Sequence, residues 1–320
     1  MWAQEEHFRS IRAGEKVLFS PARAGHTGVC LAYPNRYAIG MGNLGFHAVY
    51  RILATTPGHW CERAFLPEER FAKEPLATLD SGRPIGDFDV LALSISFETD
   101  YLNLPALFAG AGLPLRSRER DGRHPLVIAG GSAVFLNPEP IADFVDVFLV
   151  GEAEELLPEF LQFLGSARER GWSRERILEE AWRVEGVYVP RLYEPVYEGA
   201  SLIELRGPRG SDRVRRRYVA DLDRFPTTTQ IVANDVAFGD MFLVEGSRGC
   251  QWGCRFCAAG FMYRPIRTRS PESLLEDAVR GLGERGTIGV VGAEIASLPG
   301  IAALATAVAD RGGRTSPASL

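Results

Sequence analysis

Three of the five cysteines in this chain, Cys250, Cys254 and Cys257, lie within eight residues of one another, in the spacing C-x3-C-x2-C. The other two, Cys30 and Cys61, lie far upstream. A short cluster of thiols favours a soft-metal site over a disulfide framework. The identity of the metal then decides the chemistry.

Zinc is the weaker interpretation of the cluster. A structural zinc site needs four ligands in a closed tetrahedron, yet no histidine follows His124, and the two remaining cysteines fall in what reads as another domain. Three thiolates can instead hold three corners of a [4Fe-4S] cluster and leave one iron open to a small molecule. Thiol redox chemistry without a metal is a further alternative.

The residues around the cysteines extend the pattern. The run GCQWGCRFCAAG at 249–260, followed by YRPIR at 263–267, resembles a branch of the radical S-adenosylmethionine (radical SAM) proteins in which a cobalamin-binding-like domain precedes the radical core. The resemblance implies that the three cysteines bind a [4Fe-4S] cluster and that its open iron binds the amino and carboxylate groups of SAM. One electron, from a donor such as flavodoxin or ferredoxin, would then cleave SAM to a 5'-deoxyadenosyl radical.

The same resemblance implies further SAM-binding residues. Phe256 corresponds to the aromatic residue beside adenine, and Gly292-Ala293-Glu294 corresponds to a Gly-Gly-Glu-like segment after the second strand, with alanine in place of the second glycine. Arg264 and Arg267 could neutralise a carboxylate or a phosphate, or could face solvent. No catalytic residue is indicated by the sequence.

Length and composition bound these expectations. The chain has 320 residues, 46% of them hydrophobic, which is room for about two globular domains. Its N-terminus is acidic and lacks the apolar segment of a signal peptide, and no stretch approaches the ~18 apolar residues of a membrane span. A cytoplasmic protein without membrane contact is therefore expected, and the formal net charge of −5 gives no global case for nucleic acid.

Apolar runs that alternate with helix-length segments predict an α/β fold. After an irregular leader at 1–26, which could contain a short helix, residues 27–165 predict a doubly wound, flavodoxin-like parallel sheet. The predicted strands are 29–33, 60–66, 90–96, 126–129 and 145–150, and the predicted helices are 44–54, 101–111 and 152–164. In such a sheet, ligands bind beyond the carboxyl ends of the strands.

This segment is similar to the cobalamin-binding domains of radical SAM proteins. The similarity implies a cobalamin site at the loops after the third, fourth and fifth strands, formed by Ser94, Ser96, Gly130, Gly131, Gly151 and Glu152. The D-x-H-x-x-G signature, whose histidine ligates cobalt from below, is absent, and His47 inside a predicted helix fits a packing residue better than a ligand. Cobalamin would therefore bind without that ligand, or else the domain is a relic or holds the substrate.

The remainder of the chain predicts a connecting module and the start of a second parallel pattern. Residues 166–235 are expected to form an interdomain module with a strand at 186–190 and a hairpin that turns at 207–210. Six arginines between Arg206 and Arg217 could touch RNA phosphates, or form a solvated hairpin. Residues 236–320 predict about two βα units of a partial TIM-type radical SAM barrel, with a third strand expected near Thr315, so the core is expected to be truncated at its C-terminus.

Three functions follow from these patterns. The first is a radical SAM enzyme that modifies an unknown substrate, by radical chemistry or, with cobalamin, by methyl transfer. The second is an iron-sulfur or cobalamin-binding module without turnover. The third is an RNA-associated protein that uses the arginine-rich segment, which would require a salt-dependent affinity.

Overall fold

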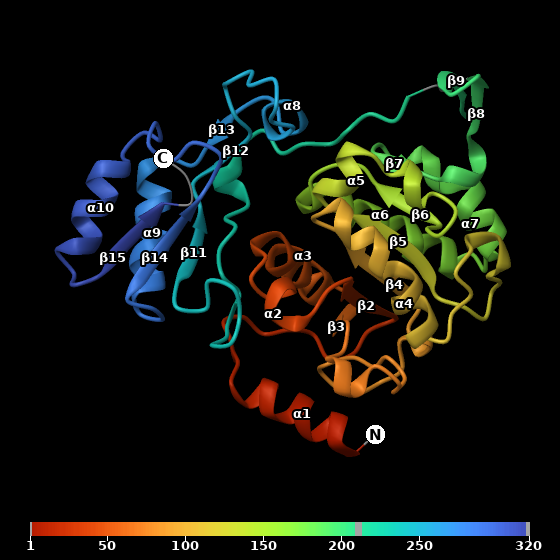
Figure 1. Ribbon diagram of the computed structural model, residues 1–320, viewed down its shortest axis with the longest axis horizontal. Helices are drawn as coiled ribbons and strands as arrows, with labels where there is room; N and C mark the ends of the chain where they lie inside the picture. Colours follow the sequence, from red (N-terminus) through yellow and green to blue (C-terminus); the bar gives the residue numbers. More distant parts are fainter. Residues whose placement is uncertain (1, 209–212, 318–320) are drawn as a thin grey trace. The chain divides into compact units, whose positions relative to one another are not determined.

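The computed structural model describes residues 2–208 and 213–317, and its helices and strands are labelled in Figure 1. The chain divides into two compact units. Unit 1 comprises Met1–Arg12, Pro21–Gly40 and Val49–Tyr218, and unit 2 comprises Ala13–Ser20, Met41–Ala48 and Val219–Leu320. The domain boundaries expected from the sequence, at 27–165, 166–235 and 236–320, stay predictions.

Unit 1 is built on a six-stranded sheet with the strand order β3-β2-β4-β5-β6-β7. Its strands are β2 (Thr27–Tyr33), β3 (His59–Phe65), β4 (Val90–Ser94), β5 (Leu126–Gly130), β6 (Val147–Leu149) and β7 (Val187–Tyr188). All neighbours pair in parallel except β6 and β7, which pair antiparallel. The first five strands therefore follow the order 2-1-3-4-5 of a flavodoxin-like sheet, which confirms the predicted α/β fold class.

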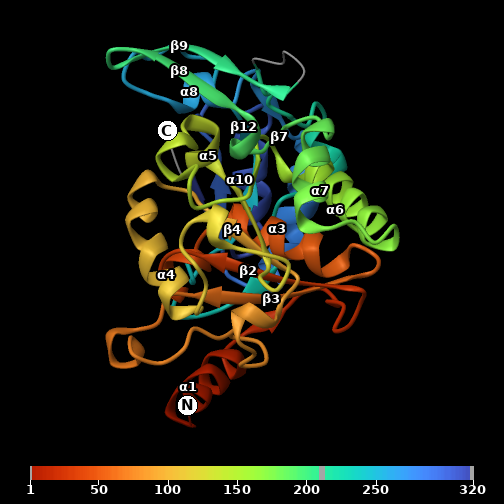
Figure 2. The ribbon, with the colours of Figure 1, turned by 90° about the vertical axis from the view of Figure 1, so that its right-hand side faces the viewer.

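Helices cover both faces of this sheet, and Figure 2 shows the strands between α4 and α6. The helices after the first strand are α2 (Tyr37–Gly40), α3 (Leu44–Thr55), α4 (Leu104–Gly110), α5 (Ser132–Leu136), α6 (Ala153–Glu169) and α7 (Arg174–Glu180). In α6 the residues Leu157, Phe160, Leu161 and Leu164 are buried, at the three- and four-residue spacing of one helix face. On the other side, α4 and α5 supply buried apolar residues to a core shared with the strands.

Unit 2 contains a second, smaller parallel sheet with the order β11-β14-β15. Its strands are β11 (Phe242–Glu245), β14 (Thr287–Val291) and β15 (Arg314–Pro317), and its crossover helices are α9 (Pro271–Leu282) and α10 (Ile301–Ala309). The Ser270 side chain caps α9 by accepting from the Ser273 backbone N–H, and Pro271 occupies the first turn. These are the βα units that the sequence predicts, and β15 is the third strand expected near Thr315.

Short pairings complete unit 2. β1 (Lys16–Val17) pairs antiparallel with β10 (Ile231–Val232), and β12 (Ser247–Arg248) pairs antiparallel with β13 (Arg267–Thr268). A short helix, α8 (Ala259–Met262), lies between β12 and β13 in the sequence. Segments far apart in the chain therefore build this unit.

Two regions of unit 1 differ in detail from the expected pattern. Within the predicted leader, α1 (Trp2–Ala13) is a 12-residue helix, held where the Arg12 guanidinium donates to the Leu79 carbonyl at 2.5 Å. The hairpin is formed by β8 (Glu194–Glu198) and β9 (Ser201–Arg206), so the predicted turn position was wrong. The chain turns where Gly199 supplies a positive φ of 62°. Residues 207–210 lie partly outside the described chain.

Candidate functional site

The three clustered cysteines lie on one loop of unit 2, residues 249–266, which we call the cysteine loop. It follows β11 through β12 and returns through β13, with Ser247 opposite Thr268 and Arg248 opposite Arg267. The loop thus begins beyond the carboxyl end of a parallel strand. Ligands of parallel α/β proteins bind at this end of the strands.

The exposure of the thiols separates the clustered cysteines from the other two. Cys254 is exposed and Cys250 and Cys257 are half-buried, whereas Cys30 and Cys61 are buried. Burial raises the pKa of the Cys30 and Cys61 thiols well above the ordinary value. Since thiolates are the metal ligands, the two buried thiols are unsuited to the role and the three loop thiols are suited to it.

The three cysteines of the loop are the residue type that binds an iron-sulfur cluster, but their side chains are not gathered into a metal-binding arrangement. Within residues 2–208 and 213–317, no group of three or more His, Cys, Asp or Glu side chains is gathered closely enough to hold a metal ion. The Cys257 backbone N–H donates to the Cys254 carbonyl at 3.1 Å, so these two cysteines share one turn. The assignment of the cluster ligands therefore rests on residue type, spacing and exposure.

Glycines allow the cysteine loop to fold back on itself. Gly249 has a φ of 86°, and a Cβ there would lie 2.4 Å from the Tyr263 carbonyl oxygen. A Cβ on Gly260 would lie 2.6 Å from the Trp252 carbonyl oxygen. Both distances are far below van der Waals contact, so the entry and exit of the loop pack together only because these positions lack side chains.

The segment Gly292-Ala293-Glu294 follows β14 directly and lies beside the cysteine loop. The Gln251 side-chain amide donates to one carboxylate oxygen of Glu294 at 3.2 Å, and the Ser297 hydroxyl donates to the other at 2.6 Å. The Ser297 hydrogen bond is the main cause of a lowered pKa at Glu294, and Gln251 adds to it. The structure therefore brings an ionised carboxylate next to the cysteines, at the place expected for contact with a cationic amino group.

Close packing at position 292 leaves no room for a side chain, so this position requires glycine. A Cβ there would lie 2.3 Å from the Ser247 hydroxyl oxygen at the entry to the cysteine loop. The Ser247 hydroxyl is itself buried and has no hydrogen-bond partner within the described part of the chain. This residue, which the sequence pattern did not single out, joins the end of β14 to the start of the loop.

The remaining predicted residues near the loop have different environments. The Phe256 ring is 93% exposed, so it is not a packing residue of unit 2. Arg264 lies over the Phe261 ring at 4.6 Å. Arg267 is buried and donates to the carbonyls of Val219, Tyr263 and Pro265. The expectation that Arg267 neutralises an anion or faces solvent was therefore wrong, because backbone carbonyls occupy its guanidinium.

In unit 1, the residues predicted for cobalamin lie along the carboxyl ends of β4, β5 and β6. Ser94 is in register with Gly130, and the Ser132 hydroxyl donates to the Ser96 carbonyl at 3.1 Å. Gly131 has a φ of 115°, and a Cβ there would lie 2.3 Å from the Ile95 carbonyl oxygen. These positions share one edge of the sheet, so they stay the predicted cobalamin positions.

The β6 end of this edge is covered by the chain itself. Gly151 forms a parallel bridge with Arg217, and the Glu152 backbone N–H donates to the Arg217 carbonyl at 3.1 Å. The Glu152 side chain is buried and lies 3.7 Å from the Arg216 guanidinium. Any ligand that used Gly151 or Glu152 would have to share this position with Arg216 and Arg217.

His47 is a packing residue, as its position in a helix suggested. One ring nitrogen, Nε2, lies 2.8 Å from the Met41 carbonyl oxygen, and Nδ1 accepts from the Gln230 backbone N–H at 3.0 Å. The ring is 4% exposed. Both nitrogens are used within unit 2, so this histidine is not a cobalt ligand.

Four arginines of the arginine-rich segment form ion pairs with glutamates of unit 1. The described ion pairs are Arg206 with Glu204, Arg215 with Glu185, Arg216 with Glu152, and Arg217 with Glu155 and Glu159. Arg209 lies outside the described residues. Because the paired arginines already face carboxylates, the segment offers a weak electrostatic case for phosphate binding.

Residues important to the site were not evident from the sequence pattern. Gln251 and Ser297 orient Glu294, and Arg269, directly after β13, is almost completely buried between two carboxylates. Their polar side chains look like ordinary loop residues in the sequence. Only the fold shows that their partners lie beside them.

Comparison with known proteins finds two similarities. Residues 45–190 match the family model described as "Radical SAM proteins, N-terminal". The chain is 27% identical over 296 residues to a protein of Methanocaldococcus jannaschii named "Uncharacterized protein MJ0966", an alignment that covers 91% of this chain and 55% of the relative. The chain thus spans about half the length of that relative. Across the described helices, none is both long and apolar enough to cross a membrane. Residues 45–190 are therefore similar to the N-terminal region of radical SAM proteins.

Proposed function

We propose that this chain carries the cluster-binding part of a radical SAM enzyme, with Cys250, Cys254 and Cys257 as ligands of a [4Fe-4S] cluster. The observation that carries the proposal is the position of three accessible thiols on one loop beyond the carboxyl end of β11. The family match to residues 45–190 supports it independently, because that segment does not contain Cys250, Cys254 or Cys257.

The bound cluster would supply the electron that cleaves SAM. The protein's own residues would bind and orient SAM. The Glu294 carboxylate, held by Gln251 and Ser297, is an acceptor for the SAM amino group. The bare backbone at Gly292 allows close approach at the end of β14, and the exposed Phe256 ring offers an apolar surface for adenine.

Cobalamin is the second cofactor that we propose, in unit 1. Ser94, Ser96, Gly130 and Gly131 support it by their common place at the carboxyl ends of β4 and β5. Because the loop after β2 contains no histidine, cobalamin would bind here without a histidine ligand from that loop. Titration with hydroxocobalamin, followed by its absorption spectrum, tests this: saturable binding supports methyl transfer, and no binding leaves radical chemistry without cobalamin.

The experiment for the main proposal is SAM cleavage by the reconstituted protein. With dithionite in place of flavodoxin or ferredoxin, the wild-type chain should release 5'-deoxyadenosine, and Cys254→Ala should release none above the background. Glu294→Gln should keep its cluster but need higher SAM concentrations, by about tenfold for one lost charge-assisted hydrogen bond. A cluster with no SAM cleavage at any SAM concentration would favour a binding module without turnover.

A further inference from the structure

Packing against an apolar core does not hold the exposed part of the cysteine loop in place. Residues 251–256 are all exposed, and Cys250 and Cys257 on either side are only half-buried. An apolar core therefore does not fix the orientation of the three thiols. Gln251 contacts Glu294 from the exposed part, and the buried contacts that can fix the loop lie at its two ends, where β12 and β13 pair.

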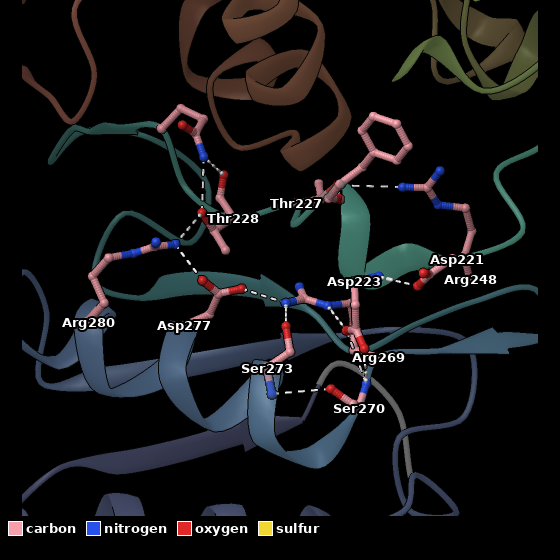
Figure 3. Close-up of polar contacts among 12 residues, drawn as sticks. Asp221, Asp223, Thr227, Thr228, Arg248, Arg269, Ser270, Ser273, Asp277 and Arg280 are labelled. Atoms are coloured by element: carbon pink, nitrogen blue, oxygen red, sulfur yellow. Dashed lines mark hydrogen bonds and ion pairs between the residues drawn. The ribbon is translucent and has the colours of Figure 1, made fainter. Parts of the chain in front are cut away.

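Polar contacts tie both ends of the loop to the segment 219–228, which precedes β11. At the entry, Arg248 donates to both carboxylate oxygens of Glu245 at 2.7 and 2.9 Å. It also donates to the Thr227 hydroxyl at 3.5 Å, and Figure 3 shows this contact. At the exit, Arg267 donates to the Val219 carbonyl at 2.6 Å.

Arg269 makes the most extensive of these contacts. Its Nε donates to Asp223 at 2.8 Å, and its Nη2 donates to Asp277 of α9 at 2.9 Å and to the Ser273 hydroxyl, as drawn in Figure 3. Its backbone N–H donates to the Gly246 carbonyl at 2.9 Å, immediately before β12. One residue thus joins the exit of the loop, the entry of the loop, the preceding segment and the helix that follows.

The chemistry of this contact suits a positioning role. The Arg269 side chain is 1% exposed and lies between carboxylates that are 35% and 6% exposed. A buried ion pair is weak evidence for stability, because desolvation offsets much of the attraction, but it does specify one geometry. A lysine would keep the charge, but its compact ammonium lacks the planar fork through which Arg269 reaches Asp223 by Nε and Asp277 by Nη2.

We propose that Arg269 is the positioning residue of the cysteine loop: by bridging Asp223 and Asp277, it fixes β13 and so holds Cys250, Cys254 and Cys257 in the arrangement that binds the cluster. This inference rests on the proposed function for its consequence, which is retention of the cluster. Its structural part, the ordering of β12 and β13, is independent of iron.

The test compares Arg269→Lys with a matched control, Arg280→Ala. Arg280 donates to the same Asp277 at 2.6 Å and to the Thr228 hydroxyl at 3.4 Å, but its side chain is 59% exposed and none of its described hydrogen bonds reaches residues 247–269. Amide hydrogen exchange is measured over residues 247–268 in the iron-free proteins, and iron loss to a chelator is measured after reconstitution. Arg269→Lys should exchange about tenfold faster there and lose iron about tenfold faster, with Arg280→Ala close to wild type in both.

Amide exchange and iron loss together distinguish a failure of the Arg269 proposal from a failure of the proposed function. Unchanged exchange in a folded Arg269→Lys overturns the proposal, and so does faster exchange with unchanged iron loss, since the role would then be structural only. If the wild type takes up no iron, the proposed function fails, while the exchange comparison still decides whether Arg269 orders the loop. If Arg269→Lys does not fold, Asp223→Asn replaces it. This substitution is at a partly exposed carboxylate and leaves the ion pair between Arg269 and Asp277 in place. The same two measurements, amide exchange and iron loss, apply to it.

Discussion

Asp100 lies beyond the carboxyl end of β4, and only 1% of it is exposed. The Asn35 amide donates to one of its carboxylate oxygens at 2.9 Å, and the other oxygen is buried with no partner in the described part of the chain. Burial raises its pKa, and the Asn35 hydrogen bond only partly opposes this effect. The folded protein therefore holds the proton of Asp100 more tightly than the unfolded chain does.

The sign of the pH dependence follows. As pH rises above the ordinary aspartate pKa of about 3.9, the unfolded chain loses this proton first, so ionisation of Asp100 lowers the free energy of unfolding. Asp100→Asn should remove that decline, and urea denaturation of unit 1 between acidic and neutral pH measures it. If the variant showed the same decline as the wild type, Asp100 would not be its source.

Asp223 should show the opposite sign. Burial alone would raise its pKa, but hydrogen bonds from Arg269 and Ser270 outweigh burial and lower it. The stabilisation is therefore present above the ordinary pKa of about 3.9 and is lost as pH falls below it. Asp223→Asn should destabilise unit 2 at neutral pH and have less effect in acid, as followed by urea denaturation. An equal loss at both pH values would contradict the lowered pKa.

At the scale of single residues, the sequence predicted kinds of chemistry better than contacts. The three accessible cysteines stand out by type and spacing. The use of Arg267 could not be predicted, because its carbonyl partner at Val219 lies 48 residues away along the chain. The same holds for His47, whose Nδ1 accepts from Gln230 at a separation of 183 residues. Polar side chains with distant partners leave no local signal.

At the scale of elements, three glycines of unit 1 allow the cost of a positive φ to be distinguished from the cost of a steric clash at Cβ. Gly131 has both a positive φ and a Cβ position 2.3 Å from the Ile95 carbonyl oxygen. Gly112 has a φ of 66° but nothing within 4 Å, and Gly165, inside α6, has open space and no positive φ. Substitution by alanine should therefore cost different amounts at the three positions.

The expected changes in the free energy of unfolding of unit 1 are graded. Gly131→Ala should lower it by about 3 kcal/mol and Gly112→Ala by about 1 kcal/mol, while Gly165→Ala should raise it by about 0.5 kcal/mol. Urea denaturation of the three variants gives the order directly. Equal losses at Gly131 and Gly112 would mean that the chain after β4 yields to the added methyl group.

Hydrophobic periodicity was enough to predict most elements of both parallel sheets. The fully buried strand β2 and the helix α9, with its cap at Ser270, carry strong local signals. The hairpin of β8 and β9 was misplaced because its strands are exposed and carry little apolar periodicity. Near the end of α1, Arg12 contacts the Leu79 carbonyl 67 residues along the chain, a partner that the local sequence does not reveal.

At the scale of the whole molecule, each unit has its own apolar core. The sequence could not show that unit 2 recruits the segments 13–20 and 41–48, because the pairing of Lys16 with Val232 joins distant parts of the chain. The parallel order of the larger sheet was predictable, since βαβ connections allow few arrangements.

Because the six-stranded sheet closes its own core, residues 21–218 should fold when produced alone. Circular dichroism and a cooperative thermal transition measure this. A spectrum of an unfolded chain would show that residues 21–218 depend on the rest of the protein for their stability.

The central claim is that Cys250, Cys254 and Cys257 bind an iron-sulfur cluster. Anaerobic reconstitution, with iron and acid-labile sulfide counted per chain, tests it most directly. The wild type should bind about four irons, Cys254→Ala should lose them, and Cys30→Ala, which removes a buried thiol of unit 1, should retain them. Stoichiometric zinc without iron uptake, or iron uptake that Cys254→Ala leaves unchanged, would contradict the claim.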